Sequence, residues 1–211
     1  MSRVAIFTDS ASDLDPADAA AEGIGIVPLL VTFGSDTYKA GVEMSTEDFW
    51  KRMVAPDAPF PKTAAASPGD FKEAFEAAFT AGAEAIVSVN VAGTLSGAIK
   101  SAQIARDMLP DREIHVVDSL GASMGQGILA RMGVELAAEG RPAAEIAETL
   151  DGVSHVEASD GLLRVHSRRG GEVLPALIEA AETAGRTVKD IHLLQPSLET
   201  LFVSLTGRKL G

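Results

Sequence analysis

Four short apolar runs, each about as long as a buried strand, constrain the fold of this chain most strongly. Stretches with helical periodicity separate them, which is the pattern of parallel strands joined by helical crossovers. The runs are "RVAIFTDS" (residues 3–10), "IGIVPLLVTF" (24–33), "EAIVSVN" (84–90) and "EIHVVDS" (113–119). The sequence therefore predicts an α/β fold in which helices cover both faces of a parallel sheet.

Two of the predicted helices carry clear start signals. Ser45 precedes "TEDFWKRMV" with Asp48 at the third helical position, and Ser67 precedes "PGDFKEAFEAAFTAG" with Asp70 at the same position. A serine three residues before an acid favours a capping box, here closed by an acid shorter than the usual glutamate. Two further helices are predicted at "MGQGILARMGVELAAEG" (124–140) and "AAEIAETLDGV" (143–153).

Hydrophobic periodicity lapses in "DGVSHVEASDG", residues 151–161, and we place a domain boundary there. We expect one unit at residues 1–151 and a small α+β module at residues 161–211. The module is predicted to hold strands at "LLRVHS" (162–167) and "DIHLLQ" (190–195), and helices at "GEVLPALIEAAETAG" (171–185) and "PSLETLFVSLTG" (196–207).

Composition excludes several classes of partner. Among 211 residues, 18 basic and 30 acidic side chains give a formal net charge of −12, which argues against nucleic acid and anionic membranes. The absence of cysteine excludes a disulfide frame and a thiolate zinc site. No run approaches the roughly 18 apolar residues of a membrane helix, and the apolar run at the N-terminus is too short for a signal peptide. We expect a cytoplasmic protein without membrane insertion.

Polar residues end three of the four apolar runs, and the carboxyl ends of parallel strands share one edge of a sheet. Individually, such serines are most often caps and turn residues. Together they predict a site of hydroxyls and backbone amides, which suits a monocarboxylate better than a polyphosphate. The residues in question are Thr8, Asp9, Ser10, Ser88, Asn90, Asp118 and Ser119, with Thr63, Thr94 and Ser96 added from the loops.

The stretch "GTLSGAIKSAQIA", residues 93–105, opens a predicted helix, whose free N–H groups and dipole attract an anion. It lacks the spacing of a phosphate-binding loop. It also departs from a serine-hydrolase elbow, because Ser96 directly precedes Gly97. A hydrolase that acts through Ser96 stays open as a third alternative, with no histidine placed to favour it.

Four aspartates offer oxygen ligands to a hard cation, but each also suits a turn or a cap. They are Asp9, Asp13, Asp15 and Asp118. No metal-ligand signature is present, so we expect neither a metal nor another cofactor.

Five ordered motifs resemble the DegV family of bacterial fatty-acid-binding proteins. They are "VAIFTDSASDL", "IVPLLVTFGSDTYKAGVEMSTEDFW", "KTAAASPGDF", "AGTLSGAIKSAQIA" and "IHVVDSLGASMGQG". The resemblance covers residues 3 to about 150. It implies a two-domain α/β protein that encloses a long-chain fatty acid, and in some bacteria presents the acyl chain to a fatty-acid kinase.

The resemblance also implies site residues. Thr63 and Ser96 match the family's carboxylate-binding threonine and serine, and Gly97 offers its N–H. Ser10 and Ser119 match family residues near the same site. One departure is "TAA" at residues 63–65 where the family usually has "TSQ", so a hydroxyl beside Thr63 is missing.

A larger departure begins after residue 150, where the expected lipid-covering domain is replaced. The last fifty residues, through "QPSLETLFVSLTGR", resemble the C-terminal accessory module of drug-exporter-type ABC transporter ATPases. Without a Walker motif, ATPase activity does not follow. The chain resembles a natural or engineered chimera.

Two functions follow as alternatives. The first is a non-catalytic carrier or presenter of a long-chain fatty acid. The second is a structural or interaction module whose lipid pocket is vestigial. An open apolar pocket favours self-association under either, so a homodimer is an expected form.

Overall fold

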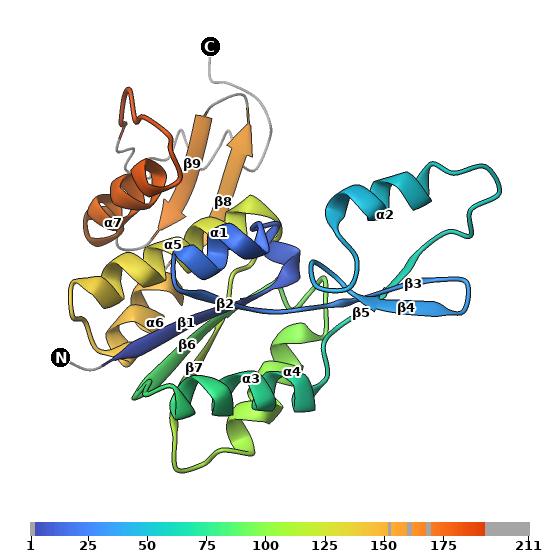
Figure 1. The fold of residues 1–211 in the computed structure, drawn as a ribbon. Helices are drawn as coiled ribbons and strands as arrows, with labels where there is room; N and C mark the ends of the chain where they lie inside the picture. The colour runs from blue at the N-terminus through green and yellow to red at the C-terminus, as the bar shows by residue number, and fades with distance from the viewer. Residues whose placement is uncertain (1–2, 152, 160–161, 168–169, 193–211) are drawn as a thin grey trace.

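The structure is a computed structural model that describes residues 3–151, 153–159, 162–167 and 170–192. At its centre is a four-stranded parallel sheet in the order β2-β1-β6-β7 (Figure 1). The strands are β1 (Val4–Asp9), β2 (Ile24–Val27), β6 (Ala85–Asn90) and β7 (Glu113–Asp118). Each lies within one of the apolar runs, and the predicted α/β fold with a parallel sheet is confirmed.

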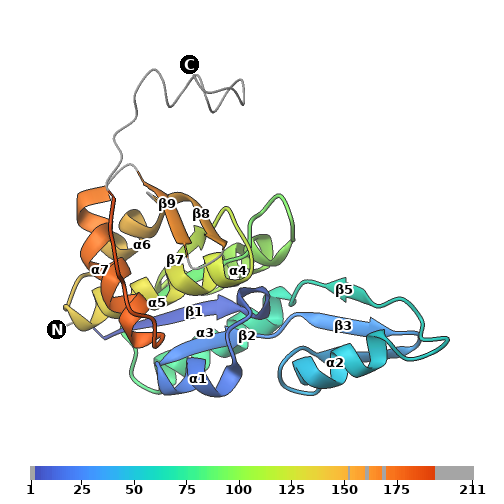
Figure 2. The ribbon, with the colours of Figure 1, turned by 90° about the horizontal axis from the view of Figure 1, so that it is seen from above.

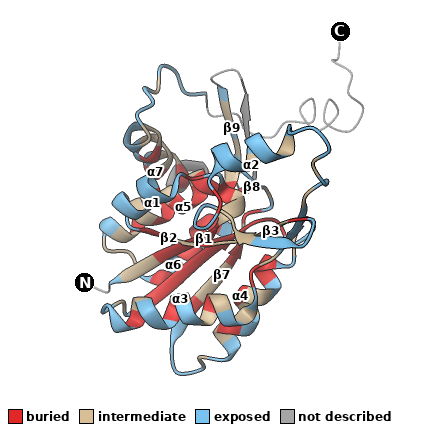
Figure 3. Cartoon of the chain, turned by 45° about the vertical axis from the view of Figure 1, so that its right-hand side comes forward, coloured by how far each residue is buried: buried red, intermediate tan, exposed pale blue. Residues whose placement is uncertain are grey.

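Helices pack on both faces of this sheet (Figures 1 and 2). Successive strand residues point to opposite faces, so Ile6 joins one core cluster and Phe7 the other. Because both faces are covered, the strands carry apolar residues on both faces, and the buried residues concentrate along them in Figure 3. One face carries α1 (Pro16–Ala21), α5 (Met124–Ala138) and α6 (Ala143–Asp151), and the other carries α3 (Pro68–Thr80) and α4 (Ala98–Asp107).

The predicted helix starts are confirmed. At α3 the Asp70 N–H donates to Ser67 Oγ at 3.1 Å, and Asp70 Oδ2 accepts from the Ser67 N–H at 2.9 Å, which completes the capping box. Hydrogen bonds from Ser67 hold the pKa of the Asp70 carboxyl below its ordinary value, against the opposing effect of partial burial. Ser45 caps α2 (Thr46–Met53) by accepting from the Asp48 N–H at 3.1 Å.

After β2 the chain leaves the sheet and forms an arm, residues 30–64, before it returns at α3 (Figures 1 and 2). The arm contains α2 and a separate antiparallel sheet in the order β4-β3-β5, with a small core of its own around Val31, Phe33 and Met44. Its strands are β3 (Leu30–Phe33), β4 (Asp36–Lys39) and β5 (Lys62–Ala64).

The prediction of one strand across residues 24–33 is wrong. Pro28 cannot donate to a strand ladder, and the chain turns there from β2 in the parallel sheet to β3 in the arm. The next backbone donor, the Leu29 N–H, bonds to Ser10 Oγ at 2.9 Å. The run is therefore divided between two sheets.

The stretch where the hydrophobic periodicity lapses, residues 151–161, contains a strand that was not predicted: β8 (Val153–Ser159) pairs antiparallel with β9 (Leu162–Ser167). The register shifts between Val153 and His155, which is the irregularity of a β-bulge. The shift lies at the start of β8, and from His155 to Ser159 the pairing with β9 is regular.

Helix α7 (Gly170–Thr183) confirms the predicted helix of the C-terminal module, as β9 confirms its first strand. Buried Val173, Ala176 and Ala180 of α7 belong to the same core cluster as Leu129 and Met132 of α5. Residues 190–192 are not in a strand, contrary to the strand predicted at 190–195. The predicted helix at 196–207 lies outside the described residues, and the division into units 1–151 and 161–211 stays a prediction.

Candidate functional site

The strand order creates a topological switch point at the carboxyl edge of the sheet, between β1 and β6, and we call this place the crevice. From β1 the chain crosses over to β2 on one side, and from β6 it crosses to β7 on the other. The loops after β1 and β6 therefore diverge, and ligands of doubly wound sheets bind at such a point. Here the strands end at Asp9 and Asn90.

The Asp9 carboxylate joins the loops on the two sides of this crevice. One oxygen, Oδ2, accepts from the Val91 N–H at 2.9 Å and the Asn90 Nδ2 at 3.3 Å. The other, Oδ1, accepts from the Ala11 N–H at 3.0 Å. Asp9 is fully buried, and these amide donors compensate its charge.

Asp118, at the end of β7, joins the β6–α4 loop to the β7–α5 loop in the same way. Its Oδ2 accepts from the Gly93 N–H at 3.2 Å and its Oδ1 from the Leu120 N–H at 2.9 Å. Asp9 and Asp118, two of the four aspartates considered above as cation ligands, are thus hydrogen-bonded to backbone amides. Among the described residues no group of three metal-ligating side chains occurs.

Ser10 lies directly after Asp9 and is half-buried. Its hydroxyl oxygen accepts from the Leu29 N–H, which fixes the turn from β2 into the arm. That bond leaves the hydroxyl proton available to an acceptor. Ser10 therefore has a structural role and a donor to offer.

Ser96 and Gly97 lie where the β6–α4 loop meets α4. The loop forms a turn in which Leu95 and Ser96 donate to the Ala92 carbonyl. The Ala98 N–H donates to Ser96 Oγ at 3.2 Å, and Gly97 is the N-cap without a side-chain cap bond. As at Ser10, the Ser96 hydroxyl accepts from the backbone and keeps its proton to donate.

Thr63 lies in β5, opposite Val31 of β3, and its side chain is exposed. Its hydroxyl has no hydrogen-bond partner within the described part of the chain. A Cβ built on Gly97 would lie 4.0 Å from Ala65 Cβ, so the chain leaving β5 passes beside the start of α4. The fold thus brings the neighbourhoods of Thr63 and Ser96 together.

Ser119 follows β7 and is 3% exposed. Its hydroxyl donates to the Gly121 carbonyl at 3.1 Å, and its N–H donates to the Asn90 carbonyl at 3.0 Å. Both groups stabilise the β7–α5 loop. Of the five predicted site residues, Ser119 is the one most fully engaged in the fold.

Sequence reasoning missed Gln126, in the first turn of α5. It is fully buried and donates from Nε2 to Thr8 Oγ1 at 2.9 Å, while its Oε1 has no partner among the described residues. A polar residue on the apolar face of an amphipathic helix was the available signal. The bond joins α5 to the last residues of β1, beneath the crevice.

Backbone strain also gathers at this edge. Asp13, Leu120 and Ser123 have φ values of 54°, 52° and 57°, which side-chain-bearing residues seldom adopt. All three lie in the segments that follow β1 and β7. Strained backbone is common where loops shape a binding site.

An open groove of about 750 Å³ runs beside Ser10, between α1, β2 and the arm. Its lining is mostly apolar, and no lysine or arginine occurs among the described residues that form it. The apolar side chains that matter below are Ile24, Ile26, Val31, Met44, Phe49 and Trp50.

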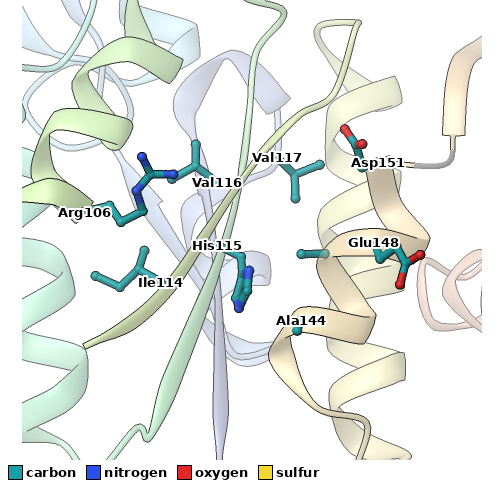
Figure 4. Close-up of a pocket in the computed structure, with 9 residues that line it drawn as sticks. Arg106, Ile114, His115, Val116, Val117, Ala144, Glu148 and Asp151 are labelled. Carbon is teal, nitrogen blue, oxygen red and sulfur yellow. The ribbon is translucent and has the colours of Figure 1, made fainter. Parts of the chain in front are cut away.

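A second pocket, of about 380 Å³, lies at the other edge of the sheet, between α4, β7 and α6 (Figure 4). Its lining combines apolar residues with ionisable ones, among them Arg106 and His115. Arg106 pairs with Asp107 at 2.9 Å, and His115 Nε2 lies 3.1 Å from Glu113 Oε1. This pocket flanks β7 instead of lying beyond the strand ends, so it is not the crevice described above.

No helix in the described part of the chain is long and apolar enough to cross a bilayer.

The family model described as "Uncharacterised protein, DegV family" matches residues 3–159. A DegV domain-containing protein of Caldanaerobacter subterraneus is 34% identical over 150 residues, which make up 71% of this chain and 52% of that protein. One from Deinococcus radiodurans is 34% identical over 175 residues, 80% of this chain and 61% of that protein. The chain thus spans 52% and 61% of the length of these curated relatives.

Solved structures share the fold. A DegV family protein from Thermus thermophilus, described by its fatty acid binding, has a TM-score of 0.63 at 25% identity, with 85% of this chain and 77% of that one covered. DegV from Bacillus subtilis, described as a fatty acid binding protein, has a TM-score of 0.66 at 23% identity, with 90% and 66% covered. The second likeness carries the fold alone. On the family match over residues 3–159, this chain belongs to the DegV family.

Proposed function

We propose that the chain binds a long-chain fatty acid through its carboxylate, as a carrier or presenter without catalysis of its own. The observation that carries the proposal is the set of neutral donors around the crevice between β1 and β6. The fatty acid binding of the Thermus thermophilus relative supports the ligand class. The proposed contacts are Thr63, Ser96, Gly97, Ser10 and Ser119.

In this proposal the carboxylate lies against the start of α4. Ser96 donates its hydroxyl proton, Gly97 its N–H, and the positive end of the helix dipole adds to the attraction. A hydrogen bond to a charged group contributes about 1.5–3 kcal/mol. Burial of some 14 methylenes at about 0.8 kcal/mol each contributes about 11 kcal/mol before the costs of association. The acyl chain therefore sets the affinity, and the hydroxyls set the orientation.

A hydrolase reaction through Ser96 is less well supported. The Ser96 hydroxyl already accepts a hydrogen bond from the Ala98 N–H. His115 lies at the β7 edge of the sheet, beside Glu113. A presenter would need an acyl-chain user as partner, and a cytoplasmic fatty-acid kinase fits the role. The carrier role and the kinase partner are proposals, because the chain spans only part of the length of its relatives.

The alternative, a structural or interaction module, has its own support. Leu95 and Leu120 in the loops around the crevice are 69% and 50% exposed. Exposed apolar side chains of this kind favour contact with a second chain, including a homodimer. The proposed accessory module of the ABC type and the chimeric origin rest mainly on "QPSLETLFVSLTGR", residues 195–208, which lie outside the described residues.

Titration calorimetry with palmitate tests the proposal. Ser96→Ala should weaken binding by about 1–3 kcal/mol, because a charged acceptor loses a donor. Ser101→Ala, one turn further along α4, is the matched control and should leave the affinity unchanged. Equal affinities for both variants and the wild type would refute the carboxylate contact.

A further inference from the structure

Strand β7 is the last strand of the parallel sheet on the side away from β2, and among the described residues no strand pairs with its outer side. The pocket of about 380 Å³ runs along this edge. The four consecutive residues 114–117 all line it, although their side chains alternate between the two faces of the sheet. Figure 4 shows Arg106 of α4 on one side of the strand and Ala144 of α6 on the other. The floor of the pocket is therefore the free backbone edge of β7.

This edge lacks the features by which proteins usually block pairing with a further strand. β7 reads EIHVVD, without proline, glycine or lysine, and it pairs regularly with β6 over all six residues. By contrast, β2 at the opposite edge has four residues with Gly25 among them, and Pro28 follows it directly. The small side chains of Ala144 and Ala147 in the wall leave room beside β7. The edge of β7 is thus open to an added strand.

A second copy of the same strand fits this edge through its charges. When two copies of a strand pair antiparallel about a two-fold axis, one residue lies opposite its own copy, and opposed side chains point to the same face. With His115 on the axis, Arg112 of each copy lies opposite Asp118 of the other. An axis at Ile114 or Val116 removes both of these pairs. The charges therefore favour the register centred on His115.

Both members of this ion pair are available. Arg112 is exposed, with its guanidinium carbon 4.8 Å from the centre of the Phe79 ring, and it has no ion-pair partner among the described residues. The Asp118 carboxylate is half-buried and accepts from the Gly93 and Leu120 N–H groups. Each carboxylate oxygen has two lone pairs, so Asp118 can also accept from an arginine.

From these observations we infer that β7 is a homodimer interface. Two copies pair antiparallel along their β7 edges, with His115 at the two-fold axis, and their two four-stranded sheets become one continuous sheet. The inference does not depend on lipid binding. The contact also differs from a dimer formed through the exposed leucines of the loops around the crevice.

Cysteine cross-linking tests the register, because the chain contains no cysteine of its own. In His115→Cys the two thiols lie opposite each other, and the Cα atoms of opposed residues, about 4.5–5.5 Å apart, are within reach of a disulfide. Glu113→Cys is the matched control on the same strand and face. Its two copies are displaced along the strands by about 13 Å, four residues at about 3.3 Å each, which is too far. Oxidised glutathione serves as the electron acceptor, and intact mass reports the disulfide-linked dimer.

A pair of charge reversals tests the ion pairs. Arg112→Glu places an acid opposite Asp118 at both ends of the strand pair and should raise the dissociation constant of the dimer about tenfold or more. Lys100→Glu makes the same change of charge at an exposed position of α4 outside the lining of the pocket, and should leave the constant unchanged. Analytical ultracentrifugation over a dilution series measures both constants.

A dimer that cross-links at residue 115 but not at residue 113, and that weakens in Arg112→Glu alone, supports the β7 interface. A protein that stays monomeric at the highest concentration measured overturns it. A dimer that cross-links equally at both positions or at neither also overturns it, as does a dimer that neither charge reversal weakens, because such a dimer forms through another surface.

Discussion

The two edges of the parallel sheet differ in what they offer a ligand. Beside β2 lies an apolar groove of about 750 Å³, and beside β7 lies a pocket of about 380 Å³ with arginine, histidine and acids around it. Both edge strands are short and parallel to their neighbours, so the strands do not cause the difference. The segments beside the two strands cause the difference. The arm follows β2, whereas α4 and α6 flank β7 with charged residues.

This comparison assigns the apolar groove beside the sheet to the arm. The sheet and its helices bury two core clusters, one on each face of the sheet. The arm, with its small separate core, adds exposed apolar side chains beside β2, among them Val42 and Trp50. The crevice supplies donors, and the arm supplies the apolar wall.

The largest expected effect is the dependence of affinity on chain length. If the acyl chain lies at the apolar β2 edge, the four methylenes that separate laurate from palmitate add about 3 kcal/mol, at about 0.8 kcal/mol each. A ligand held only by the charged β7 pocket would gain little from them. Calorimetry with the saturated series measures the slope, and a flat series would remove the distinction between the edges.

A matched pair of strand substitutions comes next. Ile26→Thr at the β2 edge should weaken palmitate binding by about 1–2 kcal/mol, because it places a hydroxyl in the apolar lining. Val116→Thr makes the corresponding change in β7, in the lining of the other pocket, and should not alter affinity. Both residues are half-buried, so thermal melting should show similar losses of stability. Equal losses of affinity would contradict the assignment.

The next prediction concerns a site away from both edges, where α7 packs on α5. Burial, with Glu179 and Glu139 nearby, raises the pKa of Glu135 above its ordinary value, against a hydrogen bond from Thr183. A raised folded-state pKa means that stability is fully present below the unfolded-state pKa and is lost as pH rises through the folded-state value.

Glu135→Gln should therefore remove this loss and stabilise the fold at neutral pH by less than about 1 kcal/mol, since the group is only partly buried. Palmitate affinity should not change. Thermal melts between pH 4 and pH 7 provide the measurement, and a variant whose stability falls with pH as steeply as the wild type would contradict the prediction.

The smallest expected effect comes from Asp13, an exposed acid in the lining of the groove. Asp13→Asn should strengthen palmitate binding by about 0.5 kcal/mol, because a like charge near the carboxylate is removed. Added salt should reduce the difference between variant and wild type. A difference that does not depend on salt would mean that the carboxylate lies elsewhere.

Much of the fold could be predicted from sequence because its signals are local. The capping box of Ser67 and Asp70 lies within four residues, and each parallel strand is a continuous apolar run. The arm could not be predicted, since β5 pairs with β3 over a long separation, Thr63 opposite Val31. β8 was missed because small and polar residues dominate its sequence, VSHVEAS, so its apolar alternation is weak.

The candidate site divides in the same way. Sequence placed hydroxyls at the strand ends, and the fold gathers those ends at one edge. The local bonds from the Ala11 and Leu120 N–H groups fit the turn roles expected of Asp9 and Asp118. The bonds from the Val91 and Gly93 N–H groups could not be predicted, since they depend on loops that meet only in the folded chain. The groove beside Ser10 depends on the arm and was missed with it.

Lipid extraction from the protein purified without detergent, read by mass spectrometry, tests the central claim most directly. The account predicts a long-chain fatty acid in near-stoichiometric amount, and a marked reduction of it in Ser96→Ala but not in Ser101→Ala. An empty protein that also takes up no added palmitate would contradict the account and favour the interaction module.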